Sequence, residues 1–265
     1  MLSDEELDRY ARHLVLREVG GPGQARIRAA KVLVVGAGGL GSPAALYLAA
    51  AGIGTLGLAD GDVVSLSNLQ RQILFRTSDV GRGKVEAGAE ALKALNPGVQ
   101  INLHPVRITA GNVAGIIAGY DIVADGTDNF TTRFLLNDAC FFAQKPLVSA
   151  AVTEFEGQLA TYRGWQPDLP CYRCLFPAPP PPGAVPSCSE AGVLGAAAGV
   201  MGALQALEVL KEAAGLGTGL AGKILTYKAL TAEFRTARLP PDPACPLCGP
   251  DPKIHDLSDH DSGHG

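Results

Sequence analysis

Three glycines stand at positions that suit the binding of a phosphate group. Gly36, Gly38 and Gly41 have the G-x-G-x-x-G spacing, directly after a short apolar run and before an Ala-rich segment. Glycines let the backbone turn tightly and approach a phosphate, and a helix that begins there favours negative charge. Asp60 follows the next apolar run, where an acidic side chain can hold ribose hydroxyls. The pattern predicts an adenine nucleotide and leaves three alternatives open: NAD, ATP and a tight turn without a ligand.

Polar and cationic side chains follow this second apolar run. They are Asn68, Arg71, Gln72 and Lys84. A triphosphate needs several cations because charge builds on its oxygens during transfer, whereas the nicotinamide half of NAD needs few. The set therefore favours ATP over NAD. The alternative is that Arg71 and Lys84 are solvated surface charges.

Two carboxylates follow the apolar run 121–124, which is the expected fourth parallel strand. They are Asp125 and Asp128, in the sequence ADGTDN that ends at Asn129. In an open α/β sheet, ligands bind in the crevice beyond the carboxyl ends of the strands. A carboxylate there can hold Mg²⁺, which takes one or two protein oxygens alongside phosphates. For Asp128 the alternative is an N-cap of a helix that begins near Thr131.

Four of the six cysteines form two C-x-x-C pairs. These are Cys171, Cys174, Cys245 and Cys248. Four thiolates in this arrangement match a tetrahedral structural zinc site without an open coordination position. Such a site would tie the C-terminal segment to the middle of the chain. Redox-active dithiols are the alternative.

The other two cysteines have different surroundings. Cys188 follows the Pro-rich run 179–182 and precedes a helix expected from Ala191. A thiol near a helix N-terminus has a lowered pKa, so Cys188 is a candidate reactive thiol, with an incidental small residue as the alternative. Cys140 stands in an apolar helical segment and is expected in the core.

The elements that position these residues alternate between strands and helices. Strands are expected near residues 31–35, 55–59, 99–104, 121–124 and 146–150, with helices between them and an amphipathic helix over 3–17. This order predicts an α/β fold with a Rossmann-like, mostly parallel sheet and helices on both faces. Antiparallel strands near 152–163, 223–230 and 233–238 would extend it.

Composition excludes several classes of protein. The chain has 265 residues, 47% of them apolar, a formal net charge of −4 and a pI of about 5.7. A general nucleic-acid binder would show a basic patch or a high pI. The polar N-terminus lacks an apolar leader, and no apolar run is long enough for a membrane span. We therefore expect a cytoplasmic protein that binds neither nucleic acid nor membrane.

The motifs together identify a family. The chain resembles the ubiquitin-activating-enzyme-like adenylyltransferases of the MoeB/ThiF/HesA group from about Leu7 to Gly249. The resemblance rests on RYARHLVL, GAGGLGSP, LADGDVVSLSNLQRQ, VGRGKVEA, DGTDN, PCYRCLF, CSEAGVLG, MGALQALEVLK and CPLCG. It implies one adenylation domain over 1–249, with a nucleotide-binding half (about 1–150) and a carrier-binding and zinc half (about 151–249). The tail 250–265 is expected to be disordered.

The resemblance also implies an activity. Such enzymes use ATP and Mg²⁺ to adenylate the C-terminal Gly-Gly carboxylate of a ubiquitin-like sulfur carrier, similar to MoaD or ThiS, and release pyrophosphate. The carrier then serves molybdopterin, thiamin or tRNA thiolation pathways. Because a rhodanese-like domain is lacking, a separate sulfur donor (a rhodanese or a cysteine desulfurase) is expected.

The resemblance assigns roles residue by residue. Gly36, Gly38, Gly39, Gly41, Asp60, Asn68, Arg71, Gln72, Lys84, Asp128 and Asn129 would bind the nucleotide, with Asp128 holding Mg²⁺. Arg71, Lys84, Asp128, Arg12 and Cys188 would form the catalytic set. Arg12 would enter the ATP site of the neighbouring subunit, which implies a homodimer. Cys188 would lie near the carrier tail. An NAD-dependent oxidoreductase and a non-catalytic binder of ubiquitin-like proteins are the competing hypotheses.

Overall fold

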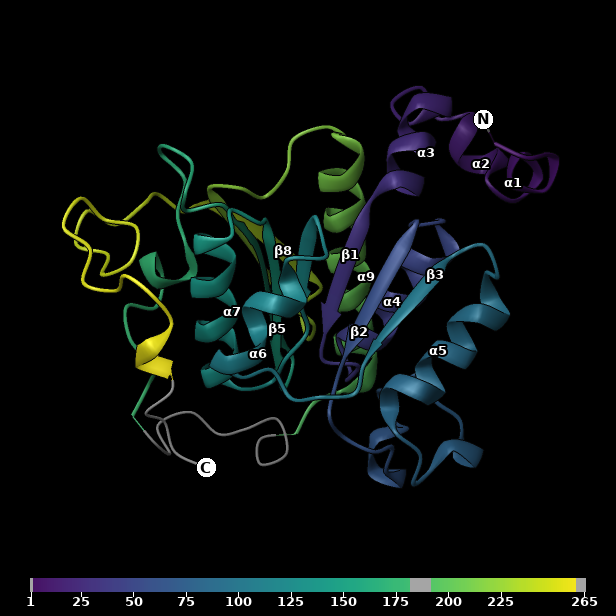
Figure 1. Cartoon of the computed structure of the whole chain (residues 1–265), viewed down its shortest axis with the longest axis horizontal. Coiled ribbons are helices and arrows are strands. Elements are labelled where there is room, and N and C mark those ends of the chain that lie inside the picture. The colour runs from purple at the N-terminus through teal and green to yellow at the C-terminus, as the bar shows by residue number, and fades with distance from the viewer. Residues whose placement is uncertain (1, 182–191, 261–265) are drawn as a thin grey trace.

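One eight-stranded sheet forms the centre of the protein (Figure 1). The computed structural model describes residues 2–181 and 192–260. The strand order is β3-β2-β1-β4-β5-β6-β7-β8, with β1 to β5 parallel and β6 to β8 antiparallel. The strands are β1 (Lys31–Val35), β2 (Thr55–Ala59), β3 (Gln100–His104), β4 (Ile122–Asp125), β5 (Leu147–Thr153), β6 (Glu156–Tyr162), β7 (Lys223–Lys228) and β8 (Glu233–Arg238). The predicted sheet, with its antiparallel extension, is confirmed.

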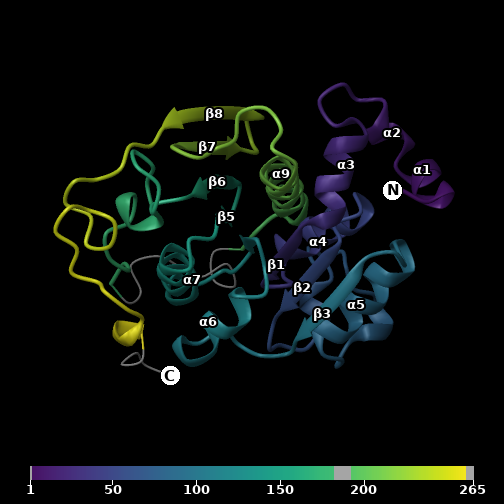
Figure 2. The same cartoon turned by 45° about the horizontal axis from the view of Figure 1, so that its top comes forward.

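Helices cover both faces of the sheet (Figure 2). One layer contains α3, α4, α5 and α9, and the other contains α6 and α7. The helices are α1 (Asp4–Arg9), α2 (Ala11–Leu14), α3 (Gly20–Ala29), α4 (Gly41–Ala50), α5 (Lys84–Leu95), α6 (Ala110–Ile117), α7 (Phe130–Phe142) and α9 (Gly195–Ala214), with short 3-10 turns at Leu66–Asn68, Thr77–Asp79, Tyr172–Cys174 and Ser258–His260.

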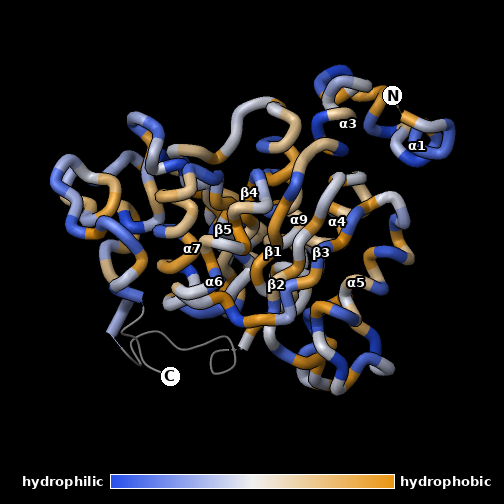
Figure 3. Tube along the Cα trace, in the orientation of Figure 1, coloured by the Kyte–Doolittle hydropathy of each residue, from blue (hydrophilic) through white to orange (hydrophobic). Residues whose placement is uncertain are grey.

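The central strands are apolar on both sides because each side meets a layer of helices. In β1, Val32 and Val34 pack into the core cluster under α4 and α9, while Leu33 and Val35 pack into the cluster under α6 and α7. Figure 3 shows the hydrophobic residues gathered along these strands and the polar residues at α1. This alternation explains why the central strands lack a polar face.

The N-terminal segment differs from the prediction. The single helix expected over 3–17 is instead two short helices, α1 and α2, separated at Tyr10. The Tyr10 side chain is buried, and its hydroxyl accepts a hydrogen bond from Asn96 Nδ2 at 2.9 Å. Burial of this ring against α4 and α5 turns the chain out of the helical path.

The carboxyl ends of the parallel strands meet at one edge of the sheet. Here β1 ends at Val35, β2 at Ala59 and β4 at Asp125, and their register keeps Val35 beside both Ala59 and Asp125. The loops that follow these strands are therefore neighbours in space. They carry the glycine motif, Asp60 and the DGTDN sequence, which the fold brings together as predicted.

Candidate active site

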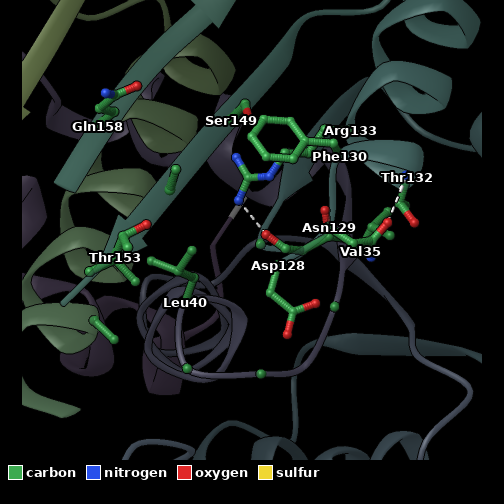
Figure 4. Close-up of a pocket in the computed structure, with 18 of the residues that line it drawn as sticks. Val35, Leu40, Asp128, Asn129, Phe130, Thr132, Arg133, Ser149, Thr153 and Gln158 are labelled. Atoms are coloured by element: carbon green, nitrogen blue, oxygen red, sulfur yellow. Dashed lines mark hydrogen bonds between the residues drawn. The ribbon is translucent and has the colours of Figure 1, made fainter. Parts of the chain in front are cut away.

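A cavity of about 970 Å³ opens at this edge of the sheet (Figure 4). Its wall contains most of the residues that the sequence singled out, namely Gly36, Gly38, Gly39, Asp60, Arg71, Gln72, Lys84, Asp128 and Asn129. Gly41 and Asn68 lie beside the cavity without lining it, and Arg12 lies on α2 with its side chain exposed. Cys188 falls outside the described residues.

The glycine loop packs backbone against backbone. Gly36 has a φ of +85°, and a Cβ at this position would lie 3.0 Å from the Gly126 carbonyl oxygen. A Cβ at Gly41 would lie 1.8 Å from the Gly36 carbonyl oxygen, so no other residue fits there. Gly41 thus supports the loop from within α4, while Gly38 and Gly39 face the cavity.

Asp60 holds the glycine loop to the end of β2. Its Oδ2 accepts a hydrogen bond from the Ala37 amide, and its Oδ1 accepts one from the Asp62 amide, both at 2.9 Å. The carboxylate is largely buried, with 9% of the side chain exposed. Its predicted contact with a ribose stays a prediction, but its hydrogen bonds fix the glycine loop that lines the cavity.

Lys84 is the first residue of α5 and lies buried between two carboxylates. Its Nζ is 3.4 Å from Asp60 Oδ2 and 3.2 Å from Asp62 Oδ2. Burial alone would raise the pKa of Asp62, but the positive charges of Lys84 and Arg107 lower it by more. The pKa of Asp62 therefore lies below its ordinary value. The alternative of a solvated surface charge is wrong for Lys84, whose side chain is only 7% exposed. Asp62 was missed in the sequence, although the repeated acidic residue in LADGD could have revealed it.

Arg71 and Gln72 contact the glycine loop at Gly39 and Gly38. The Arg71 stem packs against Gly39, where a Cβ would lie 3.3 Å from the Arg71 Cγ and Cδ atoms. Its Nη1 donates to the Ser67 carbonyl at 3.1 Å. Gln72 is 4% exposed, and its buried Oε1 has no hydrogen-bond partner among the described residues. A buried, unpaired acceptor is costly, so Gln72 fits a donor supplied by a ligand.

Three polar residues at and after the end of β4 have distinct positions. Asp125 is fully buried, and its carboxylate accepts hydrogen bonds from the Thr127 amide, the Thr127 hydroxyl and the Ser149 hydroxyl. Asn129 caps α7, because its Oδ1 accepts from the Thr132 amide at 2.8 Å. The alternative of an Asp128 cap is therefore wrong. Asp128 is exposed on the cavity wall, and Figure 4 shows its carboxylate directed into open space.

Asn68 has a local role. Its Oδ1 accepts a hydrogen bond from the Ser65 amide at 3.2 Å, which closes the short turn ahead of Arg71. A phosphate contact of Asn68 stays a prediction. What the structure adds is that Asn68 fixes the turn carrying Arg71 and Gln72.

The four paired cysteines converge. Their Sγ atoms lie within 4.8 Å of one another, with separations of 4.0 Å for Cys171 and Cys174, 3.5 Å for Cys171 and Cys245, and 3.3 Å for Cys174 and Cys248. A Zn–S bond of about 2.3 Å puts tetrahedral sulfurs roughly 3.8 Å apart. The cluster is therefore compatible with zinc. Cys140 is buried in the core as expected, and burial raises the pKa of its thiol.

A buried ion network joins α7 to the first cysteine pair and to the C-terminal tail. Arg173 donates to Asp138 from Nε at 2.8 Å and from Nη2 at 2.7 Å, and His260 Nε2 lies 2.8 Å from Asp138 Oδ2. Burial raises the pKa of Asp138, but Arg173 and His260 lower it more. The expectation of a disordered tail is wrong for 250–260, since His260 and the partly buried Leu257 pack on the domain.

Comparison with known proteins identifies the family. A sequence profile described as the ThiF family matches residues 10–247. The chain belongs to the ThiF family. None of the helices in the described part of the chain is long and apolar enough to cross a membrane.

Relatives in this family cover most of the chain. A protein named sulfur carrier protein adenylyltransferase from Thermus thermophilus is 49% identical, over 97% of this chain and 96% of its own length. The SAMP-activating enzyme E1 of Haloferax volcanii is 48% identical, over 94% and 91%. The bovine adenylyltransferase and sulfurtransferase MOCS3 is 51% identical over 98% of this chain, which spans 57% of that protein.

A solved structure agrees in fold. Escherichia coli MccB with ATP has a TM-score of 0.79 at 23% identity, covering 91% of this chain and 74% of that one. At this identity the likeness shows the fold alone. It supports the doubly covered sheet with an antiparallel extension.

Proposed function

We propose that this ThiF-family protein uses ATP to adenylate the C-terminal Gly-Gly carboxylate of a ubiquitin-like sulfur carrier, releasing pyrophosphate. One observation carries the proposal: a glycine loop, a buried Lys84, Arg71 and an unpaired Asp128 line one cavity. The names of the Thermus and Haloferax relatives point to the same activity. We also propose that 1–249 acts as one adenylation domain, with a nucleotide half (about 1–150) and a carrier and zinc half.

The proposed chemistry needs alignment and positive charge rather than a general base. A C-terminal carboxylate has a pKa of about 3.5 and is already ionised at neutral pH. It attacks the α-phosphorus of ATP, a bond forms to the carboxylate oxygen, and pyrophosphate leaves with the bonding electrons. Lys84 is held in place by two carboxylates before substrate binds, and Arg71 extends along the glycine loop. Such fixed cations stabilise developing charge without rearranging.

The cavity extends beyond the nucleotide end in a way that suits a peptide tail. Its wall continues over the exposed faces of β5, β6 and β7, with Thr153, Gln158 and Thr226 on one side of the sheet. These polar side chains border a strip that α7 leaves open among the described residues. An extended Gly-Gly tail would enter along this strip towards the glycine loop.

Two metals fit the side chains present. Asp128 suits Mg²⁺ because it is a solvent-facing carboxylate, for which no described residue supplies a partner. Bound with the phosphates, Mg²⁺ would neutralise part of their charge. The four thiols suit a structural Zn²⁺ on sulfur type, number and spacing. Asn129 lines the cavity with its Oδ1 already engaged, so any contact with the nucleotide would use its NH₂ group.

We also propose a homodimer with composite sites, in which Arg12 enters the ATP site of the neighbouring subunit. Arg12 is exposed on α2 and does not line the cavity of its own chain. The exposed apolar side chains of Tyr47 and Leu207 border a hollow of about 320 Å³ between α2, α4 and α9, and Val15 is exposed just after α2. Exposed apolar side chains that border one hollow support burial against a second copy.

Mixing two inactive variants tests the composite site. An Arg12→Ala protein mixed with an Asp128→Ala protein should recover about a quarter of wild-type activity per mole of chain, because one of the two sites in a mixed dimer has both residues intact. The measurement is pyrophosphate exchange after subunit exchange has been verified by native mass spectrometry. An absence of recovery in verified mixed dimers would contradict the trans arrangement.

The remaining proposals concern the pathway. Sulfur would come from a separate donor, a rhodanese or a cysteine desulfurase, and the activated carrier would serve molybdopterin, thiamin or tRNA thiolation in the cytoplasm. Cys188 would lie near the carrier tail. The name of the bovine relative, adenylyltransferase and sulfurtransferase MOCS3, supports a link between activation and sulfur transfer.

Pyrophosphate exchange tests the proposed function. Incorporation of labelled pyrophosphate into ATP should require a carrier that ends in Gly-Gly, and Asp128→Ala should abolish it. The expected dependence on carrier follows from the carboxylate being the nucleophile. Exchange at the wild-type rate in Asp128→Ala would contradict the role of Asp128, and exchange without carrier would contradict the substrate.

A further inference from the structure

The loop that carries Asp128 begins where two strands separate. The parallel pairing of β4 with β5 ends at the Asp125–Ser149 pair. Beyond this pair, the chain after β4 turns towards the glycine loop, where Gly126 packs against Gly36 and Gly41. The backbone carbonyls that follow the last strand pair therefore need partners from side chains.

Arg133 supplies the partners on one side of the sheet. It projects from the first turn of α7, and only 8% of it is exposed. Its Nη2 donates to the Thr127 carbonyl and to the Ala150 carbonyl, the second at 3.0 Å. One guanidinium nitrogen thus bridges the loop after β4 and the adjacent strand β5. Figure 4 shows the guanidinium between Ser149 and Asp128 with a hydrogen bond to the loop.

Gln205 bridges β4 and β5 from the opposite face of the sheet. It lies on α9 and is fully buried, and its Nε2 donates to the carbonyls of Asp125 at 2.7 Å and Val148 at 2.9 Å. Two side chains from opposite helix layers therefore span the same gap between β4 and β5. Gln205 holds the last residue of β4, and Arg133 holds the residue next to Asp128.

Arg133 differs from Gln205 because its side chain carries a positive charge. Within residues 2–181 and 192–260, no carboxylate forms an ion pair with its guanidinium. A guanidinium carries five N–H donors, and the two carbonyls use those of Nη2. Arg133 lines the cavity, so its positive charge lies beside the site for an anionic substrate. Burying an unpaired charge is costly, which suits a residue that meets an anion during function.

We propose that Arg133 is a positioning residue for Asp128: its bond to the Thr127 carbonyl fixes the direction in which the Asp128 carboxylate enters the cavity. The Asn129 cap fixes the other side of Asp128, so Asp128 is held between two anchored neighbours. This inference rests on the proposed role of Asp128 towards Mg²⁺ and ATP. It assigns to Arg133 an effect that passes through Asp128.

A double-mutant cycle on nucleotide binding tests the inference. Arg133→Lys keeps the charge and removes the planar fork, and Asp128→Asn removes the carboxylate charge. We expect Arg133→Lys to raise the Kd for Mg·ATP about tenfold in the otherwise wild-type protein, and by less than about twofold when Asp128→Asn is present. Titration calorimetry on the full chain, with ATP and MgCl₂ and without carrier, measures all four proteins. Arg235→Lys on the exposed strand β8 is the matched control and should leave the Kd unchanged.

Each outcome decides the question. An equal loss of affinity in both backgrounds would show that Arg133 acts independently of Asp128 and would overturn the inference. If Arg133→Lys does not fold, Arg133→Gln replaces it in the same cycle, because it also removes the guanidinium that bridges the Thr127 and Ala150 carbonyls and should show the same coupling. An Asp128→Asn protein that binds Mg·ATP as tightly as wild type would also overturn the inference. Mg·ATP binding with the expected coupling but no pyrophosphate exchange would sink the proposed function alone.

Discussion

The two ends of α7 differ in whether the polar side chains around them have partners. At the N-terminal end, around the cavity, Asp128 and the Gln72 Oε1 atom have no partner among the described residues. In the second half of the helix, Asp138 is equally polar but is bonded by Asn137, Arg173 and His260. A buried polar group without a hydrogen-bond partner costs folding stability, whereas a paired one does not. We infer that the N-terminal end of α7, beside the cavity (the cavity end), is arranged for a ligand. The end around Asp138, beside the cysteines (the paired end), is arranged for folding.

The largest loss of folding stability is expected at the paired end, around Asp138. Asp138→Asn leaves Arg173 buried without a counterion and should destabilise the folded protein by about 3 kcal/mol. Urea unfolding of the zinc-loaded protein, followed by circular dichroism, measures this loss. Mg·ATP affinity should stay within about twofold of wild type below the transition, because Asp138 lies outside the cavity wall.

The control for this change is an exposed ion pair in the same tail. Asp251→Asn removes a partner of Lys253, and the two side chains are 85% and 69% exposed. Exposed pairs contribute little, so the loss should be below about 1 kcal/mol. Equal destabilisation by Asp138→Asn and Asp251→Asn would contradict the network at the paired end.

The opposite pattern is expected at the cavity end. Lys84→Met should lower the rate of pyrophosphate exchange by about 100- to 1,000-fold, because a fixed cation beside the phosphates is lost. The folded state should lose less stability than in Asp138→Asn, since Asp62 is half exposed and Asp60 keeps its hydrogen bonds from the Ala37 and Asp62 amides. Exchange kinetics with saturating carrier, together with unfolding curves, separate the two effects. A Lys84→Met protein as active as wild type would contradict the assignment of the cavity end to catalysis.

The smallest effect concerns pH. The pKa of Asp62 is lowered in the folded protein, so its pairing contributes stability above the unfolded pKa of about 4. That contribution is lost as the pH falls through the lower folded pKa. Asp62→Asn should therefore reduce the stability lost between pH 6 and pH 3 by a few tenths of a kcal/mol, because the pair is half exposed. Unfolding curves at several pH values check this, and an unchanged acid dependence would contradict the Lys84–Asp62 interaction.

The parallel core and the approximate positions of the site residues could be predicted from the sequence. The glycine motif, Asp60 and the cysteine pairs have spacings that imply their local geometry, and the structure brings the loops together. Asn129 and Asp128 have adjacent positions, and only the backbone geometry shows that Asn129 makes the cap.

Other features depend on contacts between distant segments. Arg133, Asp138 and Gln205 stand in apolar helical segments, where nothing in the spacing shows which carbonyl or ion each meets. The break at Tyr10 depends on a bond to Asn96, far along the chain. Residues 250–260 are held by contacts of Ile254, Leu257 and His260 with earlier parts of the chain. Composition predicted disorder there because it counts polar residues and does not include such contacts.

The central claim is that the unpaired groups of the cavity end serve to activate a carboxylate with ATP. Intact-mass spectrometry of a Gly-Gly carrier, incubated with this protein and Mg·ATP and quenched in acid, tests it most directly. We predict that the carrier gains the mass of one adenylyl group (AMP less one water), and that a carrier without its last glycine gains nothing. A carrier of unchanged mass, while the protein demonstrably binds Mg·ATP and the carrier, would contradict the claim.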